Sequence, residues 1–333
     1  MGYSLIVRCE AEKIEKAMTM QTLIDAQGIT KRYNDFTLDA FDITVAPDRV
    51  VGLIGSNGAG KTTLLKSILG MISPDSGSIG LLGIDLQANA AQSASIKQDI
   101  GVVLDTCAFP VFMKVRDVQI LGRAAYTHWD DARFDQLCAE FGLTAKKPVK
   151  DLSRGMGMKL TLAFALAHHP ALLVLDEVTA GLDPIAREEV LEILRTFMEE
   201  EGHGILISSH ITTDLEKIAD EIICIDDGKM VFALAKEAIC DEAGIAHCRA
   251  RELEAIASSE YAQAHRGAVT QASRSNLPTS TPSDQPLKFL SRGLAFDLLV
   301  PDRVSFARAF PDIDLERATI EDYMTLTLKG ETL

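Results

Sequence analysis

The chain has 333 residues, of which 47% are apolar and 6% aromatic, and it carries a formal net charge of -15. This length allows one large domain or two modest domains, each with a sizeable core. An acidic chain is a poor partner for nucleic acid, because contacts to phosphate require Lys and Arg, so we expect no nucleic-acid partner.

The first twenty residues are expected to form an N-terminal extension outside the fold. Residues 1–18 contain a short apolar run followed by charges, without the basic start and long apolar core of a signal peptide. Met18 and Met20 offer alternative starts. No window of the sequence reaches the roughly 20 apolar residues that cross a bilayer. The six cysteines lack metal-ligand spacing, which favours reduced thiols in the cytosol.

Residues 22–70 predict the start of a nucleotide-binding domain that extends from 21 to 235. Loose alternation of apolar and polar residues over 22–51 predicts short antiparallel strands. "RVVGLIG" then predicts a buried strand that runs into a glycine-rich turn. Apolar residues recur at helical spacing after Lys61, and Gly70 is a typical stop for that helix.

The glycine-rich turn fits the pattern G-x-x-x-x-G-K-[ST] at every fixed position. Its glycines allow backbone N–H groups to converge on phosphates, and the following helix adds its dipole. Lys61 is expected to reach the β- and γ-phosphates, and the Thr62 hydroxyl to bind Mg²⁺. A glycine turn without function is the weaker interpretation, because the pattern lies where a strand meets a helix. The predicted phosphate-binding residues are Gly55, Ser56, Asn57, Gly58, Ala59, Gly60, Lys61, Thr62 and Thr63.

The middle of the chain predicts alternating strands and helices, and therefore a largely parallel sheet. A strand over 100–105 precedes a helical insertion at about 106–170. Two further buried strands, "ALLVLDE" and "GILISSH", follow it. The helix between them is predicted to have Asp183 as N-cap, Pro184 in its first position and Gly202 beyond its end.

Two local signals are predicted to shape the end of this domain. Thr213 and Glu216 form the pattern of a capping box at the start of a helix. Asp227 and Gly228 are typical of a tight hairpin turn between two strands.

Asp176 and Glu177 end the "ALLVLDE" strand, where acids face the ligand crevice of an α/β sheet. Asp176 is expected to hold Mg²⁺, and Glu177 to act as the general base that polarises the attacking water. Alone, two acids after an apolar run commonly mark a strand entering solvent. His210 ends the next strand and is placed to contact the γ-phosphate and order the water, although a lone His is usually structural.

The tail, residues 236–333, predicts a small α+β accessory domain. Its segment 268–287 is rich in Ser, Thr and Pro and is predicted to be flexible.

These residues resemble the ATP-binding cassette (ABC) ATPases. The matches, in order, are Tyr33, the phosphate loop 55–63, "LSRGM" (152–156), "LLVLDE", "GLDP" (181–184) and His210. "LSRGM" separates this family from other phosphate-loop NTPases. The resemblance covers about 22–235 and implies an α/β cassette with a mostly parallel sheet, an antiparallel β subdomain and a helical subdomain.

The resemblance also implies a mechanical cycle in which two cassettes enclose two ATP molecules head to tail. Ser153 and Gly155 of one subunit would cap the γ-phosphate held by the other subunit. Tyr33 would stack on adenine, with an ordinary strand aromatic as the alternative, and Asp183 would link the two sites. Hydrolysis would open the pair and move the helices of a separate membrane permease.

The chain departs from the usual pattern in three places. Asp105 stands where the family has Gln; its carboxylate could still bind Mg²⁺, but it adds negative charge near phosphate. The stretch 152–156 is Leu-Ser-Arg-Gly-Met rather than Leu-Ser-Gly-Gly-Gln, and Val178 replaces a Pro after Glu177. "LSRGM" with this acid resembles the ABC-2 type exporters, including those of bacitracin and lantibiotic self-protection. The ending "ATIEDYMTLTLKG" is similar to that group.

The sequence thus predicts the ATP-hydrolysing subunit of a bacterial ABC exporter on the cytoplasmic face of the membrane, with ATP and Mg²⁺ as ligands. Its predicted partners are an integral-membrane permease and a second cassette, identical or different. One alternative is a degenerate cassette, which Asp105 and Met156 favour and which Glu177 and His210 oppose. Another is a soluble ABC protein of translation or DNA repair, although these usually carry two cassettes or a coiled coil. The cargo does not follow from the resemblance.

Overall fold

The computed structural model describes residues 22–88, 93–104, 107, 109–266 and 286–333. The predicted extension 1–20, Asp105 and residues 268–285 of the predicted flexible segment lie outside the described residues.

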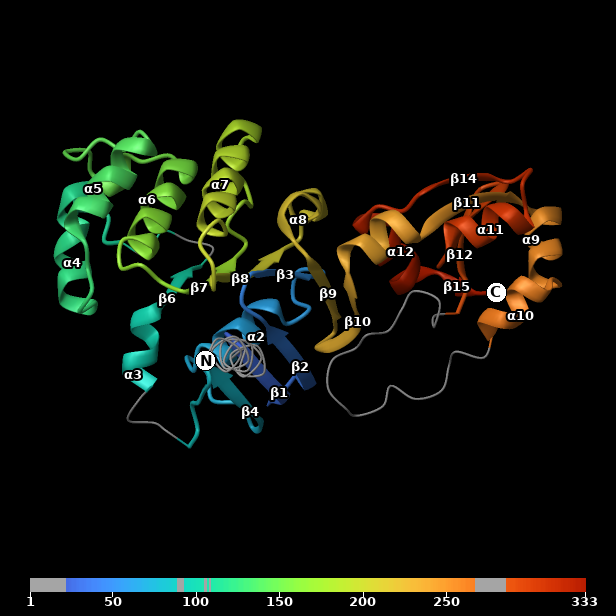
Figure 1. The fold of residues 1–333 in the computed structure, drawn as a ribbon, viewed down its shortest axis with the longest axis horizontal. Coiled ribbons are helices and arrows are strands. Elements are labelled where there is room, and N and C mark those ends of the chain that lie inside the picture. Colours follow the sequence, from blue (N-terminus) through green and yellow to red (C-terminus); the bar gives the residue numbers. More distant parts are fainter. Residues whose placement is uncertain (1–21, 89–92, 105–106, 108, 267–285) are drawn as a thin grey trace, which may run out of the picture.

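A six-stranded sheet forms the centre of the first part of the chain (Figure 1). All of its neighbouring strands run parallel except the last hairpin, which confirms the predicted, largely parallel sheet. β7 and β8 are buried along their whole lengths, as expected for strands covered on both faces. In spatial order the strands are β10 (Lys229–Ala235), β9 (Glu221–Asp226), β3 (Arg49–Ile54), β8 (Gly204–Ser209), β7 (Leu172–Asp176) and β6 (Ile100–Val103).

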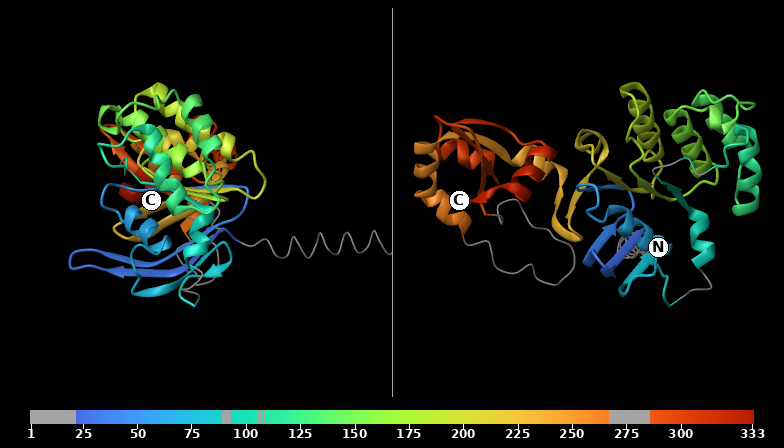
Figure 2. Two further views of the ribbon diagram at one scale, coloured as in Figure 1. Left: turned by 90° about the vertical axis from the view of Figure 1, so that its left-hand side faces the viewer. Right: turned by 180° about the vertical axis from the view of Figure 1, so that it is seen from behind.

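A second, antiparallel sheet covers one side of the central sheet, with helix α2 (Lys61–Ile68) packed between the two sheets. Figure 2 shows this sheet on the opposite side of the molecule from helices α4–α7. Gly70 follows α2 with φ +65°, so it ends the helix as predicted. The strands of this sheet, in spatial order, are β2 (Thr37–Val45), β1 (Ile24–Arg32), β4 (Ser76–Leu81) and β5 (Ile84–Asp85).

The predicted helical insertion forms a helical layer beyond β6 (Figure 1). Trp129, which is half-buried, contacts the rings of Phe134 in α5 and Phe164 in α6 at centroid distances of 5.4 and 5.1 Å. Gly122 allows this packing, because a Cβ there would lie 2.3 Å from the indole. Its elements are α4 (Val118–Ala125), α5 (Asp131–Glu140) and α6 (Arg154–Leu166), with 3₁₀ turns at Val115–Asp117 and Val149–Asp151. Helix α3 (Ser93–Ile96) and the 3₁₀ turn at Lys97–Asp99 precede β6 and lie outside this layer.

Helix α7 (Pro184–Phe197) begins as predicted and ends earlier than predicted. The Asp183 carboxylate accepts hydrogen bonds from the N–H groups of Ile185 and Ala186, at 3.1 and 3.0 Å. The helix stops at Phe197, five residues before Gly202. Three consecutive glutamates, 199–201, follow that end, and negative charge is unfavourable at the negative end of the helix dipole.

The predicted capping box at Thr213 is wrong. Helix α8 (Thr212–Ile218) begins one residue earlier, and Ile211 occupies its N-cap position without a side-chain hydrogen bond. Glu216 instead accepts a hydrogen bond of 2.9 Å from the N–H of Ile320, in the tail. The Glu216 carboxylate therefore accepts a hydrogen bond at the start of the tail helix that begins at Ile320, and not at the start of α8 as the local pattern predicted.

The tail folds as an α+β unit around a five-stranded antiparallel sheet, as predicted. In spatial order its strands are β14 (Asp314–Arg317), β11 (Gly244–Arg249), β13 (Ala295–Val300), β12 (Lys288–Arg292) and β15 (Glu331–Thr332). Its helices are α9 (Ala250–Ala257), α10 (Glu260–Arg266), α11 (Arg303–Ala309) and α12 (Ile320–Lys329), and a π-helical turn at Ala238–Glu242 leads into it.

Helix α12 joins this tail unit to the first part of the chain. Tyr323 is 1% exposed and contacts the Phe232 ring of β10 edge to face at 5.1 Å. Ile320 and Leu326 are buried in the same hydrophobic cluster, which also contains Leu215 of α8. One apolar core is therefore shared between the two units.

Because of this shared core, Tyr323→Ala is expected to lower the free energy of unfolding by about 3–5 kcal/mol, the usual cost of truncating a buried aromatic ring. Tyr323→Phe keeps the ring and should cost far less. Urea unfolding of the full chain, followed by circular dichroism, measures both. Equal stability of Tyr323→Ala and the unchanged chain would contradict a shared core.

Candidate functional site

The glycine-rich turn between β3 and α2, which carries the predicted phosphate-binding pattern and is called the phosphate turn below, has a backbone that requires glycine. Gly58 and Gly60 adopt φ values of +86° and +113°. A Cβ on Gly55 would lie 2.2 Å from the carbonyl oxygen of Ile225. Among the described residues, no side chain caps α2 and no acid occupies its first turn. The N–H groups at this helix end therefore favour an anion.

The hairpin between β9 and β10 forms a backbone hydrogen bond with the phosphate turn. Asp227 and Gly228 both have positive φ, +44° and +74°, as a tight hairpin requires, which confirms the predicted turn. The N–H of Gly228 donates to the carbonyl of Ala59 at 2.9 Å. The phosphate-binding pattern is thus held in place by a segment about 170 residues further along the chain.

Lys61 is a buried cation at the centre of the site, with 6% of its side chain exposed. Its ammonium donates to the carbonyl oxygens of Gly55 and Ser56, at 2.7 and 3.2 Å. It also lies 3.3 Å from Oε1 of Glu177. A buried charge is tolerated only with such partners, so this arrangement places the ammonium firmly at the mouth of the turn.

Asp176 receives hydrogen bonds on both carboxylate oxygens. The Thr62 hydroxyl donates to Oδ2 at 2.7 Å, and the Ser208 hydroxyl donates to Oδ1. Within the described residues, no three His, Cys, Asp or Glu side chains converge on one point as a metal cage. Thr62 and Asp176 nevertheless fit Mg²⁺, which typically takes one or two protein oxygens and completes its shell with phosphate and water.

Glu177 and His210 are brought together next to this pair. Oε2 of Glu177 lies 2.5 Å from Nδ1 of His210. Oε1 is buried and accepts no hydrogen bond from the described residues, although it faces Lys61. Glu177 also has φ +53°, a left-handed conformation that is strained for any residue with a Cβ. Such strain commonly occurs at functional sites.

"LSRGM" and "GLDP" pack against each other and away from the phosphate turn. Ser153 is the N-cap of α6 and accepts from the N–H of Met156 at 3.3 Å. A Cβ on Gly155 would lie 3.2 Å from that of Ala186, and one on Gly181 would lie 3.2 Å from the guanidinium of Arg154. Among the contacts of the described residues, none joins Ser153 or Gly155 to the phosphate turn of the same chain.

Tyr33 lies beside the phosphate turn with 46% of its surface exposed. Its ring centroid is 6.4 Å from that of Phe36, and Phe36 in turn approaches within 2.7 Å of a Cβ built on Gly60. Sequence reasoning missed Phe36. A second aromatic three residues after Tyr33 was the available signal.

Sequence reasoning also missed the link between the helical layer and β6. The His168 ring stacks on Tyr126 at a centroid distance of 3.8 Å and lies 2.9 Å from the carbonyl of Gln98. The Gln98 side chain accepts from the N–H of Thr127 at 2.8 Å. Burial lowers the pKa of His168 to about 4, so this link is uncharged at neutral pH.

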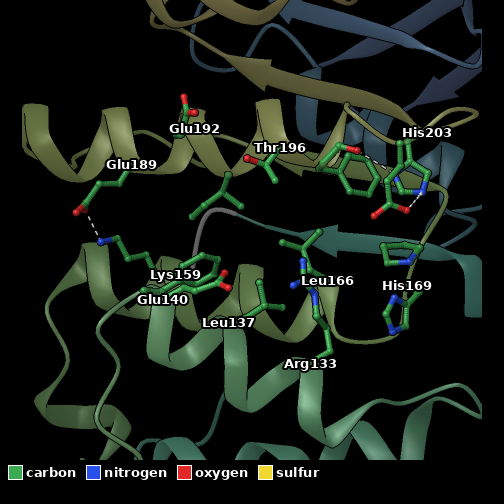
Figure 3. Close-up of a pocket in the computed structure, with 15 residues that line it drawn as sticks. Arg133, Leu137, Glu140, Lys159, Leu166, His169, Glu189, Glu192, Thr196 and His203 are labelled. Carbon is green, nitrogen blue, oxygen red and sulfur yellow. Dashed lines mark hydrogen bonds and ion pairs between the residues drawn. The ribbon is translucent and has the colours of Figure 1, made fainter.

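A cleft of about 520 Å³ between α5, α6 and α7 lies elsewhere (Figure 3). Lys159 pairs with Glu189 across it. His169 and His203 line it just before β7 and β8 begin, whereas the phosphate turn lies where the strands end. The cleft is therefore separate from the candidate site. Its lining residues are Arg133, Leu137, Glu140, Phe141, Lys159, Leu166, His169, Pro170, Glu189, Glu192, Ile193, Thr196, Phe197, Glu200 and His203.

The chain is similar to known ATP-binding proteins. The family described as ABC transporter matches residues 38–180. The bacitracin transport ATP-binding protein BcrA of Bacillus licheniformis is 33% identical over 215 residues, which cover 64% of this chain and 69% of that protein. The Nod factor export ATP-binding protein I of Rhizobium etli is 33% identical over 239 residues, covering 70% and 74%. That of Neorhizobium galegae is 35% identical, and the match spans 60% of its length.

Solved structures share the fold. The ATP-binding subunit of an ABC transporter superimposes with a TM-score of 0.60 at 26% identity, covering 66% of this chain and 92% of that one. An ATP-binding cassette solved as a dimer with ADP and phosphate has a TM-score of 0.57 at 21% identity, covering 63% and 97%.

The strained backbone of Glu177 predicts an inverted response to glycine. Glu177→Gly is expected to be more stable than Glu177→Ala by about 1 kcal/mol, since glycine adopts positive φ without a steric penalty. Thermal unfolding compares the two. Ala180→Gly, three residues on and with no positive φ, should lose stability instead. Greater stability of Glu177→Ala would count against the strain.

Proposed function

This chain belongs to the ATP-binding proteins of ABC transporters, and we propose that it hydrolyses ATP to power an exporter. The observation that carries the proposal is the contact network at the strand ends. There a buried lysine, two acids and a histidine meet at the mouth of a glycine-rich turn. This set can hold a nucleoside triphosphate and activate a water.

The phosphate turn and Lys61 would bind the triphosphate. The uncapped N-terminus of α2 supplies backbone N–H donors, and the ammonium of Lys61 adds a full positive charge beside them. Thr62 and Asp176 would hold Mg²⁺, which, when bound, offsets the charge that develops on the β- and γ-phosphate oxygens. The Tyr33 ring is exposed beside the turn, as stacking on adenine requires.

Glu177 has the geometry of a general base. His210 engages Oε2, whereas Oε1 is buried and faces Lys61, so Oε1 would take a proton from an attacking water once the Lys61 ammonium turns from it to the phosphates. Lys61 faces the same oxygen and limits how far the carboxylate can turn. This contact between the expected base and His210 speaks against the degenerate cassette that the departures at Asp105 and Met156 suggested.

The "LSRGM" residues, the signature of this family, support a composite site with a second cassette. Ser153 and Gly155 lie on the helical layer, without a described contact to their own phosphate turn. Ile185, in the first turn of α7 after "GLDP", is 74% exposed. A head-to-tail pair would bring the signature of one chain to the turn of the other. We propose a pair of identical chains, with two different cassettes as the alternative.

An exposed apolar segment at the helical layer suits a membrane permease. Phe112 is 82% exposed, and Val111, Ile120 and Leu121 are also exposed nearby in the sequence. Within the described residues, no helix is long and apolar enough to cross a membrane. We propose that this apolar segment binds the cytoplasmic loops of a separate ABC-2 type permease, which would place the chain at the cytoplasmic face of the membrane.

ATP should drive dimer formation when hydrolysis is blocked. Glu177→Gln removes the base and is expected to reduce the hydrolysis rate at least roughly 100-fold while ATP still binds. The closed pair should then accumulate, and light scattering with Mg-free ATP measures its mass. A species that stays monomeric with ATP bound would contradict pairing of identical chains.

Lys61→Ala is the matched control for this experiment. It removes the ammonium that faces the phosphates, so neither ATP binding nor ATP-driven dimerisation should occur. A dimer that persists in Lys61→Ala forms without nucleotide and would not support the proposed cycle.

The permease surface is tested by Phe112→Ser. Loss of an exposed ring that becomes buried on binding should weaken association with membranes containing the permease by about tenfold or more. Co-sedimentation of the full chain with permease-containing vesicles measures this. Leu294→Ser is the control, because Leu294 is 96% exposed on the tail unit. Equal binding of both variants would exclude this surface.

A further inference from the structure

We propose that Ser208 is a positioning residue that orients both the proposed Mg²⁺ ligand Asp176 and the proposed base Glu177. The inference rests on the proposed function and deepens it. Ser208 would touch neither substrate nor metal, and it would act through the two acids.

The position of Ser208 follows from the register of the central sheet. Asp176 of β7 pairs with Ser208 of the parallel neighbour β8, at the ends of both strands. Ser208 is fully buried, at 0% exposure, and Asp176 is 3% exposed. A hydroxyl buried beside a buried carboxylate must form a hydrogen bond, and this pair has done so.

Ser208 and Thr62 hold the Asp176 carboxylate from two sides. Thr62, on α2, donates to Oδ2, and Ser208, on β8, donates to Oδ1. With both bonds in place, the plane of the carboxylate is set by two separate elements of the fold. Without the Ser208 hydroxyl, Oδ1 would be a buried anionic oxygen that has lost its donor, and the carboxylate could rotate about its last bond.

Ser208 also accepts hydrogen bonds from the backbone N–H of Glu177, whose conformation is strained. The N–H of Glu177 points at both the hydroxyl and the carbonyl oxygen of Ser208, at 3.3 and 3.1 Å. Glu177 has the left-handed φ of +53°, so its conformation depends on such external contacts. One serine therefore contacts both the carboxylate of Asp176 and the backbone from which the Glu177 side chain starts.

The adjacent serine provides a matched control. Ser209 is also buried, at 1% exposure, and lies on the same strand. Among the described residues, its hydroxyl bonds to Ile211, accepting from the N–H at 2.9 Å and donating to the carbonyl at 3.4 Å. Removal of this hydroxyl perturbs the strand end without reaching Asp176.

The experiment measures metal affinity directly, with Mn²⁺ as the spectroscopic probe. Full-length Ser208→Ala, Ser208→Thr and Ser209→Ala are saturated with ADP, and bound Mn²⁺ is quantified by electron paramagnetic resonance. We expect Ser208→Ala to bind Mn²⁺ roughly 10-fold more weakly, as is typical when a group that orients a ligand is lost. Ser208→Thr keeps the hydroxyl and should restore affinity, and Ser209→Ala should match the unchanged chain.

Nucleotide binding in EDTA separates this inference from the proposed function. All variants should bind ADP without metal as the unchanged chain does, because among the described residues the Ser208 hydroxyl bonds to Asp176 and Glu177 and not to the phosphate turn. Unaltered Mn²⁺ affinity in Ser208→Ala would overturn the positioning role while the proposed function stands. Failure of the unchanged chain to bind nucleotide would overturn both. If Ser208→Ala does not fold, Ser208→Cys takes its place, and unaltered Mn²⁺ affinity there is equally decisive.

Discussion

The burial of the Lys61 ammonium is the constraint on which the rest of the site depends. A charge with 6% exposure is costly unless it is paired and hydrogen-bonded, and here the partners come from different elements. Two carbonyl oxygens belong to the phosphate turn, and the carboxylate belongs to the residue after β7. The ends of β3 and β7 must therefore align to within a residue. The parallel register through β8 provides this alignment.

The part of the site that the sequence predicted consists of residues with local signals. The phosphate turn follows its own strand and precedes its own helix. Asp176 ends the buried strand β7, and Glu177 and His210 directly follow the buried strands β7 and β8. Parallel strands bring such ends to one edge of the sheet, so the topology converts separate local patterns into one cluster. The largely parallel sheet followed for the same reason, because hydrophobic runs alternated with helical patterns through the middle of the chain.

The residues that the sequence did not reveal have partners far along the chain. In the sequence Ser208 looks like an ordinary strand residue. Its proposed positioning role depends on Asp176, 32 residues away. Gln98 and His168 are joined across 70 residues. The Thr213 capping box failed in the same way, since Glu216 bonds to an N–H 104 residues later. In each case a polar group met a tertiary partner that no local window contains, and burial made that partner the stronger one.

This last contact also explains why the tail unit cannot be regarded as a separately tethered module. Helix α8 begins two residues after His210. Glu216, in its second turn, accepts a hydrogen bond from the first N–H of α12. Leu215 of α8 lies in the same apolar cluster as Ile320 and Tyr323. A displacement of α8 that carried His210 with it would therefore break a hydrogen bond and open a packed core at the tail. Helix α8 consequently couples the position of His210 to the packing of the tail unit.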